Sequence, residues 1–210
     1  MTRISFILFL PLIVFFLSCN DRDEKPATGD PSQKTDTVIA GTPSVNPYAP
    51  VDISPMDMTY FPVNYPKLKM ANTVSTPPIA RVVYSRPHKQ GRTIFGNLLK
   101  YGEQWRLGAN EATEIEFFQP VTVQGKKINA GRYVMYCLPY ENKWTIILNS
   151  NLYTWGLKID SAKDLMKFDI PVKKVTTNFE YFTMIFEKAP AGADLVMAWD
   201  NVEARLPVNF

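Results

Sequence analysis

The chain has 210 residues, of which 46% are hydrophobic, 13% aromatic and 20% charged, and its net charge is +3. This composition is typical of a folded protein and excludes a collagen, a coiled coil and a wholly disordered chain. Seventeen prolines against ten glycines, with abundant β-branched and aromatic residues, favour short strands joined by turns over long helices.

The N-terminus has the pattern of a bacterial export signal. Arg3 precedes an apolar run over residues 4–17, which is shorter than the roughly twenty residues needed to cross a membrane. The run ends in Phe16-Leu17-Ser18-Cys19, which resembles the lipobox, where a cysteine receives diacylglycerol and becomes the mature N-terminus. We therefore predict a lipoprotein signal peptide over residues 1–18 and lipidation of Cys19. A plain secretory signal is the alternative.

Lipidation predicts a location in the cell envelope, on either face of the outer membrane. Several acyl chains on one cysteine suffice for stable anchoring without a spanning helix. The acidic residues in 20–24 resemble the export signal of surface lipoproteins in Bacteroidetes. Removal of residues 1–18 takes away one arginine, so 23 basic side chains become 22 against 20 acidic ones. So small an excess predicts that nucleic acid is not a partner.

Two segments precede the predicted domain. Residues 19–42 are polar and small, and they predict a flexible tether. Residues 43–78 contain eight prolines together with many apolar side chains. We interpret them as an extended, proline-rich collar that packs on the domain, because proline confines strands to sheet edges. A polyproline strip that binds a partner is the alternative.

Residues 79–210 alternate apolar and polar side chains over short runs, which is the pattern of half-buried strands. The fold class predicted from it is all-β, an antiparallel β-sandwich or jelly roll. Short helical turns are expected at 95–100 and 161–165. The candidate strands are 79–85, 113–118, 121–123, 127–128, 132–138, 144–148, 165–172, 179–186, 195–200 and 203–208.

Few residues in the mature chain could bind a metal or act as a nucleophile. His88 and Cys137 are the only soft ligand candidates, so we predict no metal and no cofactor. Cys137 lies in the most apolar predicted strand, where a free cysteine behaves as a small hydrophobic residue. A Cys137–His88 nucleophile pair is the formal alternative.

The segment from Arg81 to Glu111 concentrates basic charge, with six basic residues against two acidic ones. Aromatic residues and glycines are interleaved with them. Guanidinium groups bind carboxylates and phosphates in a planar fork, and aromatic faces suit sugars. Alternatively, the arginines pair with acids and fasten long loops to one end of the sandwich. The predicted ligand-binding residues are Tyr84, Arg86, Lys89, Arg92, Trp105, Arg106, Asn110 and Glu111.

The same segment carries a family resemblance. Its motifs are Tyr84-Ser85-Arg86-Pro87, Lys89-Gln90-Gly91-Arg92, Ile94-Phe95-Gly96, Tyr101-Gly102 and the run from Trp105 to Thr113, continued at 125–127, 131–133 and 144–145. Together they resemble the signature of the bacterial domain of unknown function 2911 family over about residues 77–208. The resemblance implies an exported protein of a family common in Bacteroidetes, and it supplies no catalytic residues.

Three functions follow, and we favour one that is not enzymatic. The first is a binding module whose loops over residues 84–111 recognise a glycan, an anionic small molecule or an envelope protein. The second is a glycosidase-like hydrolase, with Glu111 as general acid or base, Arg106 stabilising negative charge and Asn110 orienting substrate. The third is a purely structural envelope component. For the hydrolase, the candidates for a second carboxylate are Glu103, Glu114 and Glu116.

Overall fold

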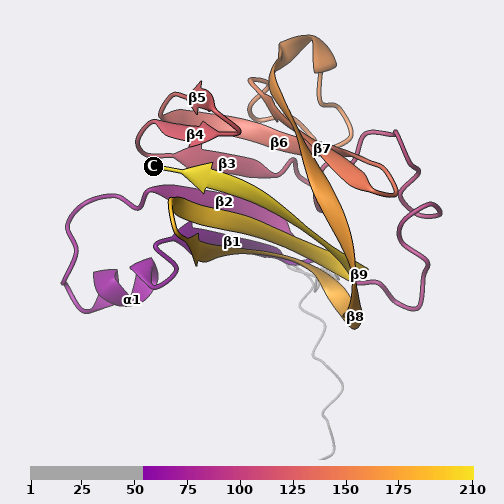
Figure 1. Cartoon of the computed structure of the whole chain (residues 1–210), viewed down its shortest axis with the longest axis horizontal. Coiled ribbons are helices and arrows are strands. Elements are labelled where there is room, and N and C mark those ends of the chain that lie inside the picture. The colour runs from indigo at the N-terminus through magenta and orange to yellow at the C-terminus, as the bar shows by residue number, and fades with distance from the viewer. Residues whose placement is uncertain (1–53) are drawn as a thin grey trace, which may run out of the picture. The chain divides into compact units, whose positions relative to one another are not determined.

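The computed structural model describes residues 54–210, and the predicted all-β class is confirmed (Figure 1). Cys19, the signal peptide, the tether and residues 43–53 of the collar lie outside the described residues. No helix within residues 54–210 is long and apolar enough to span a membrane. The strands are β1 (Met56–Phe61), β2 (Ala80–Ser85), β3 (Glu114–Phe117), β4 (Val121–Val123), β5 (Lys126–Ile128), β6 (Gly131–Pro139), β7 (Lys143–Asn149), β8 (Asp164–Ala189) and β9 (Gly192–Asn209).

All nine strands are hydrogen-bonded into one antiparallel sheet, in the order β1-β2-β3-β6-β7-β8-β9-β4-β5. The first part of β8 pairs with β7 and the rest pairs with β9, so one 26-residue strand belongs to both halves of the predicted sandwich. The predicted strands 165–172 and 179–186 are therefore one strand. The ladder shifts register between Lys174 and Phe179, and this bulge interrupts the side-chain alternation although the strand continues.

The described part of the proline-rich collar contributes more to the domain than expected. β1 pairs with β2 along its whole length and forms an edge of the sheet. Pro55 and Pro62 flank β1 instead of interrupting it, so its backbone can pair. The sheet thus begins at Met56, upstream of the predicted domain start. A helix that the sequence analysis missed, α1 (Tyr65–Met70), follows with a proline in its first turn and no buried residue.

The predicted helical turns have different outcomes. A 3-10 helix, η1 (Ser161–Lys163), confirms the turn expected at 161–165. The prediction at 95–100 is wrong, because Phe95 and Leu99 form a β-bridge and the segment between them is a turn. A hairpin turn at Gln124-Gly125 joins β4 and β5, in the gap between the predicted strands 121–123 and 127–128.

Alternate side chains of β7 and β9 meet in the main core. Trp144 and Ile146 of β7 lie in the same buried cluster as Met197 and Trp199 of β9, as the period of two predicts. Ile147 faces the other way, into a smaller cluster. The two halves of the sheet therefore enclose one main core. The surface between the strand ends is formed by the connecting loops.

The smaller cluster lies beneath the loop over residues 150–163, which is fastened by Asp164. Tyr136 Oη and Asn149 Nδ2 donate to Asp164 Oδ1, each at 2.8 Å, and Lys167 Nζ lies 3.1 Å from Oδ2. Burial opposes ionisation of Asp164, but these hydrogen bonds outweigh it and hold its pKa below the ordinary value. These hydrogen bonds from β6 and β7 therefore fix the C-terminal end of the loop.

Candidate functional site

The predicted binding segment leaves the sheet at the end of β2 and is anchored to β8. The backbone N–H of Phe182 donates to the Pro87 carbonyl at 3.0 Å, and that of Lys89 donates to the Glu180 carbonyl at 2.7 Å. The chain then turns at Gln90 and Gly91, both with positive φ. Pro87 is therefore held against β8, and the residues after Lys89 form a loop.

Trp105 returns the segment to the sheet. Its backbone exchanges two 2.8 Å hydrogen bonds with Cys137 of β6, so the loop continues the sheet beyond β3. The indole packs against four aromatic side chains at centroid distances between 4.9 and 6.0 Å: Phe95, Trp144, Phe182 and Trp199. Because large rings from both halves of the core pack closely around it, the Trp105 indole forms a rigid platform, which we call the Trp105 platform.

A pocket of about 330 Å³ lies over this platform, and it brings three of the eight predicted residues together, Arg92, Trp105 and Arg106. The remaining lining residues come from the same segment and from three other parts of the chain, at Ser54, Leu157 and Trp199. None of the described lining residues is a carboxylate. The full lining is Ser54, Pro87, Arg92, Leu98, Leu99, Gln104, Trp105, Arg106, Gly108, Ala109, Leu157 and Trp199.

Arg106 is the most unusual side chain of the pocket. Its Nε is buried and has no hydrogen-bond acceptor in the described part of the chain. No carboxylate within residues 54–210 lies at ion-pair distance from it. Burial lowers the pKa of its guanidinium below the ordinary value, although arginine stays charged in proteins. A buried cationic donor without an acceptor is costly, and an anion would satisfy it.

Arg92 adds a second positive charge to the same pocket. Its Nε donates to the Lys89 carbonyl at 2.9 Å, and its Nη2 donates to the His88 carbonyl. These carbonyls orient the guanidinium but do not neutralise it, and no acidic side chain of the described residues forms an ion pair with Arg92. Two charges without an internal counterion therefore lie beside one hollow.

The indole nitrogens of the pocket are also without partners. Nε1 of Trp105 and Nε1 of Trp199 are both buried, and neither has an acceptor among the residues that the structure describes. Most buried indole N–H groups find a partner. Together with Arg106, the lining residues thus carry three unpartnered donors.

Gly156 places the loop over residues 151–158 against Arg106. Its backbone N–H donates to the Asn110 carbonyl at 3.3 Å, and Trp155 forms a β-bridge with Glu111. A Cβ at Gly156 would overlap Arg106 Cδ and would lie 2.7 Å from the Asn110 carbonyl oxygen. Arg106 is therefore confined by backbone on this side.

Three predicted site residues have structural partners instead. Tyr84 is buried, accepts from the Met184 N–H at 2.9 Å and donates to the Met184 carbonyl at 3.2 Å, and burial raises its pKa to about 12. Arg86 lies 3.3 Å from Asp57 of β1, and Lys89 lies 2.7 Å from Asp200 of β9. None of the three lines the pocket. They join β2 and the segment after it to neighbouring strands, in line with the structural alternative, in which the basic residues pair with acids.

Asn110 and Glu111 lie next to the pocket and do not line it. Asn110 has a left-handed backbone, with φ of 59°, and its carbonyl accepts from Gly156. The side chain of Glu111 is exposed. Two of the carboxylates considered as its catalytic partner are engaged elsewhere, since Glu114 lies 3.6 Å from Arg132 and Glu116 lies 2.5 Å from Arg81.

The remaining nucleophile and metal candidates are also accounted for. Cys137 is fully buried, and burial raises the pKa of its thiol well above the ordinary value. His88 Nε2 lies 2.8 Å from Glu180, and its ring stacks on Tyr181. Within residues 54–210, no three His, Cys, Asp or Glu side chains gather as a metal site.

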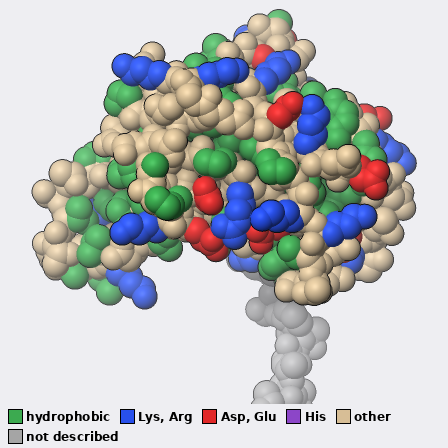
Figure 2. All heavy atoms as spheres, in the orientation of Figure 1, with side chains coloured by type: hydrophobic (Ala, Val, Ile, Leu, Met, Phe, Trp, Pro, Cys, Tyr) green, Lys and Arg blue, Asp and Glu red, His purple; other side chains and the backbone are tan. Residues whose placement is uncertain are grey.

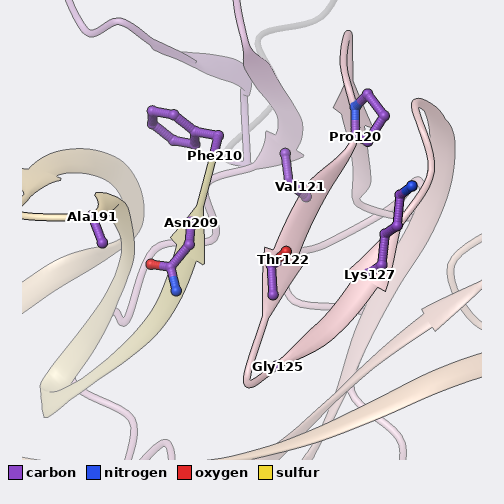
Figure 3. A pocket seen from close by; sticks show the side chains of 8 residues that line it. All are labelled: Pro120, Val121, Thr122, Gly125, Lys127, Ala191, Asn209 and Phe210. Atoms are coloured by element: carbon purple, nitrogen blue, oxygen red, sulfur yellow. The ribbon is translucent and has the colours of Figure 1, made fainter.

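A second hollow, of about 440 Å³, lies between the β4–β5 hairpin and the end of β9 (Figure 3). It exists because β4 and β9 pair only at Thr122 and Asn209. Lys127 is its one charged lining residue, and none of its lining side chains has a buried polar atom without a partner. This hollow therefore lacks the features that distinguish the pocket lined by Arg92 and Arg106, which we call the arginine pocket.

Elsewhere the surface charges are mixed. Figure 2 shows Lys and Arg side chains beside Asp and Glu on the face in view. Arg205, for example, contacts Glu187 at 2.7 Å and Glu203 at 2.8 Å. Arg92 and Arg106 thus differ from Arg205, whose charge is compensated by neighbouring carboxylates.

The sequence analysis missed Gly156, Leu157 and Trp199 as residues of the site. Trp199 belongs to the predicted strand 195–200, and the loop residues had no ligand-binding motif. The one available signal in the sequence was the alternation of large side chains at Tyr153, Trp155 and Leu157, which lie outside any predicted strand. The structure shows all three to be exposed.

The fold and the pocket define an antiparallel β domain with a cationic, aromatic hollow at one end. The family model described as "Protein of unknown function (DUF2911)" matches residues 66–208. The chain belongs to this family, and the resemblance inferred from the motifs is confirmed. Comparison with curated proteins found no match. Comparison with solved structures also found none.

Proposed function

We propose that this protein is a lipid-anchored component of the cell envelope whose β domain binds a small anion in the arginine pocket. The observation that carries the proposal is that Arg106 has a buried Nε without an acceptor and no ion-pair partner among the described residues. Arg81 and Arg86 also have a buried Nε without an acceptor, but they pair with Glu116 and Asp57. The uncompensated charge of Arg92 on the same pocket as Arg106 supports the proposal. A donor that is already oriented and desolvated, as the Nε of Arg106 is, favours an oxyanion that accepts a hydrogen bond from it.

Binding is favoured over hydrolysis by what lines the pocket. General acid–base catalysis needs a titratable group within hydrogen-bond reach of the reacting atoms. None of the twelve lining residues is an acid or a histidine, and Glu111 lies outside the lining. A hydrolase using Glu111 would therefore need a different substrate position from the one that Arg106 offers.

The anion site is tested with inorganic phosphate and glucuronate as probes. A probe at 100 times its Kd should stabilise the protein by about 2.7 kcal/mol in a thermal unfolding experiment. We expect Arg106→Met to weaken calorimetric binding by about tenfold to a hundredfold, the usual size of one charged hydrogen bond.

Arg132→Met is the matched control, because Arg132 lies outside the pocket and faces Glu114. Its affinity for the probes should equal that of the unchanged protein. Equal binding by the Arg106→Met and unchanged proteins would show that the proposed site is wrong. Neutral glycans are titrated in parallel with the two anions. Binding of the glycans alone would favour a carbohydrate site, and binding of neither anions nor glycans would favour an envelope protein as partner.

The anchor is tested at Cys19, which follows the apolar run and Ser18. We expect Cys19→Ala to remain unprocessed or to leave the membrane fraction, because no acyl chain can be attached. Carbonate washing and immunoblotting of membrane and soluble fractions measure this. Ser18→Ala keeps a small residue before the cysteine and should be processed normally. A mature Cys19→Ala protein that stays in washed membranes would refute the lipid anchor.

A further inference from the structure

The walls of the arginine pocket are apolar except at its two arginines and two neutral polar residues. Leu98, Leu99 and Leu157 line it together with the two tryptophans. Large exposed apolar side chains adjoining a charged hollow mark a ligand or partner site. Leu157 is 72% exposed and Leu98 is 44% exposed. They come from separate loops, so apolar surface is presented from two directions.

The charged side chains that line the pocket, Arg92 and Arg106, are hydrogen-bond donors. Among the lining side chains, only Ser54 and Gln104 carry an oxygen that can accept a hydrogen bond. Arginine and tryptophan side chains donate only. A neutral sugar presents hydroxyl groups that both donate and accept, so most of its donors would find no side-chain acceptor here. An oxyanion presents acceptors alone and matches this set.

We propose, on the basis of the anion site above, that the ligand is an amphiphilic organic oxyanion. Its carboxylate or phosphate head binds at Arg106 and Arg92, and its hydrocarbon body packs on Leu98, Leu157 and the Trp105 platform. The platform is held by aromatic contacts from both halves of the core, so it needs no rearrangement to accept the body. The pocket volume of about 330 Å³ suits a small molecule.

The test compares ligands that differ only in apolar length. Acetate, butyrate and hexanoate are titrated calorimetrically into the full chain, beside inorganic phosphate and butyl phosphate. We expect affinity to rise about fourfold for each buried methylene, from about 0.8 kcal/mol each. Hexanol, which has the length of hexanoate and no charge, should bind at least about tenfold more weakly, because the charged hydrogen bonds are lost. Tighter binding of the carboxylates would assign a carboxylate head group, and tighter binding of the phosphates would assign a phosphate head group. Either result supports an amphiphilic oxyanion as the ligand.

Leu157→Ser removes apolar surface without burying a polar group, since Leu157 is exposed. It should flatten the dependence of affinity on chain length, so that hexanoate loses more affinity than acetate does. Leu165→Ser is the matched control, because Leu165 is 53% exposed on β8 and does not line the pocket. Equal affinity for acetate and hexanoate would overturn the amphiphile but not the anion site. If no carboxylate or phosphate binds, the proposed function itself is wrong.

Discussion

Replacement of Trp144 by alanine is expected to lower the free energy of unfolding by about 3 to 5 kcal/mol, the usual cost of deleting a buried tryptophan. Trp144 is fully buried near the start of β7. Its ring lies 5.3 Å from that of Trp105 and 5.4 Å from that of Phe95. Its loss would open a cavity between the sheet and the loop that carries the arginine pocket. Urea denaturation followed by far-ultraviolet circular dichroism measures the change.

Trp155→Ala is the control for this substitution. It deletes the same side chain at a position that is 44% exposed and forms its β-bridge through the backbone. The expected loss is within about 1 kcal/mol, the typical effect of a point mutation. If both variants lost the same stability, the aromatic cluster around Trp105 would not be the centre of the core.

Gly156→Ala is expected to cost about 1 to 3 kcal/mol, as overpacking does in other buried sites, and to displace Arg106. The added Cβ would overlap Arg106 Cδ and approach the carbonyls of Asn110 and Glu111. Gly156 does not have a positive φ, so alanine is excluded by space and not by backbone conformation. Thermal unfolding measures the stability, and phosphate titration should show at least about a tenfold loss of affinity if Arg106 supplies a charged hydrogen bond.

A double-mutant cycle separates the contact of the added Cβ with Arg106 from its contacts with the backbone carbonyls of Asn110 and Glu111. Arg106→Ala removes Cδ, so Gly156→Ala should cost less stability in that background than in the unchanged protein. Gly125→Ala tests backbone strain alone, because φ there is 77° and an added Cβ meets nothing within 4 Å. It should leave phosphate affinity intact. Additive effects of Gly156→Ala and Arg106→Ala would contradict the contact between loop and arginine.

The candidate site was only partly predictable, and the reason lies in the distances along the chain. Arg92, Trp105 and Arg106 were found because basic and aromatic residues are concentrated in one segment. Arg86 and Lys89 belong to the same concentration but are neutralised by Asp57 and Asp200. Composition cannot distinguish an arginine with a distant acidic partner from one without, because the partner is brought near only by strand pairing.

The residues that complete the pocket show the same dependence. Leu157 enters it because the loop over residues 151–158 bridges to Glu111, and Trp199 enters it from β9. Neither contact leaves a local pattern. The eventual lining of the pocket is therefore a property of how β2, β7 and β9 are arranged around Trp105.

Local chemistry by itself determined the all-β class, the β4–β5 hairpin and the inward faces of β7 and β9. These depend on side-chain alternation and turn residues, which act over a few neighbouring positions. Only the tertiary structure decided that β8 runs unbroken through both halves of the sheet, that β1 forms its edge, and that Arg106 remains without a counterion in the described chain. Each of those outcomes depends on hydrogen bonding or charge pairing between segments far apart in sequence, and such partners are chosen only when the chain has folded.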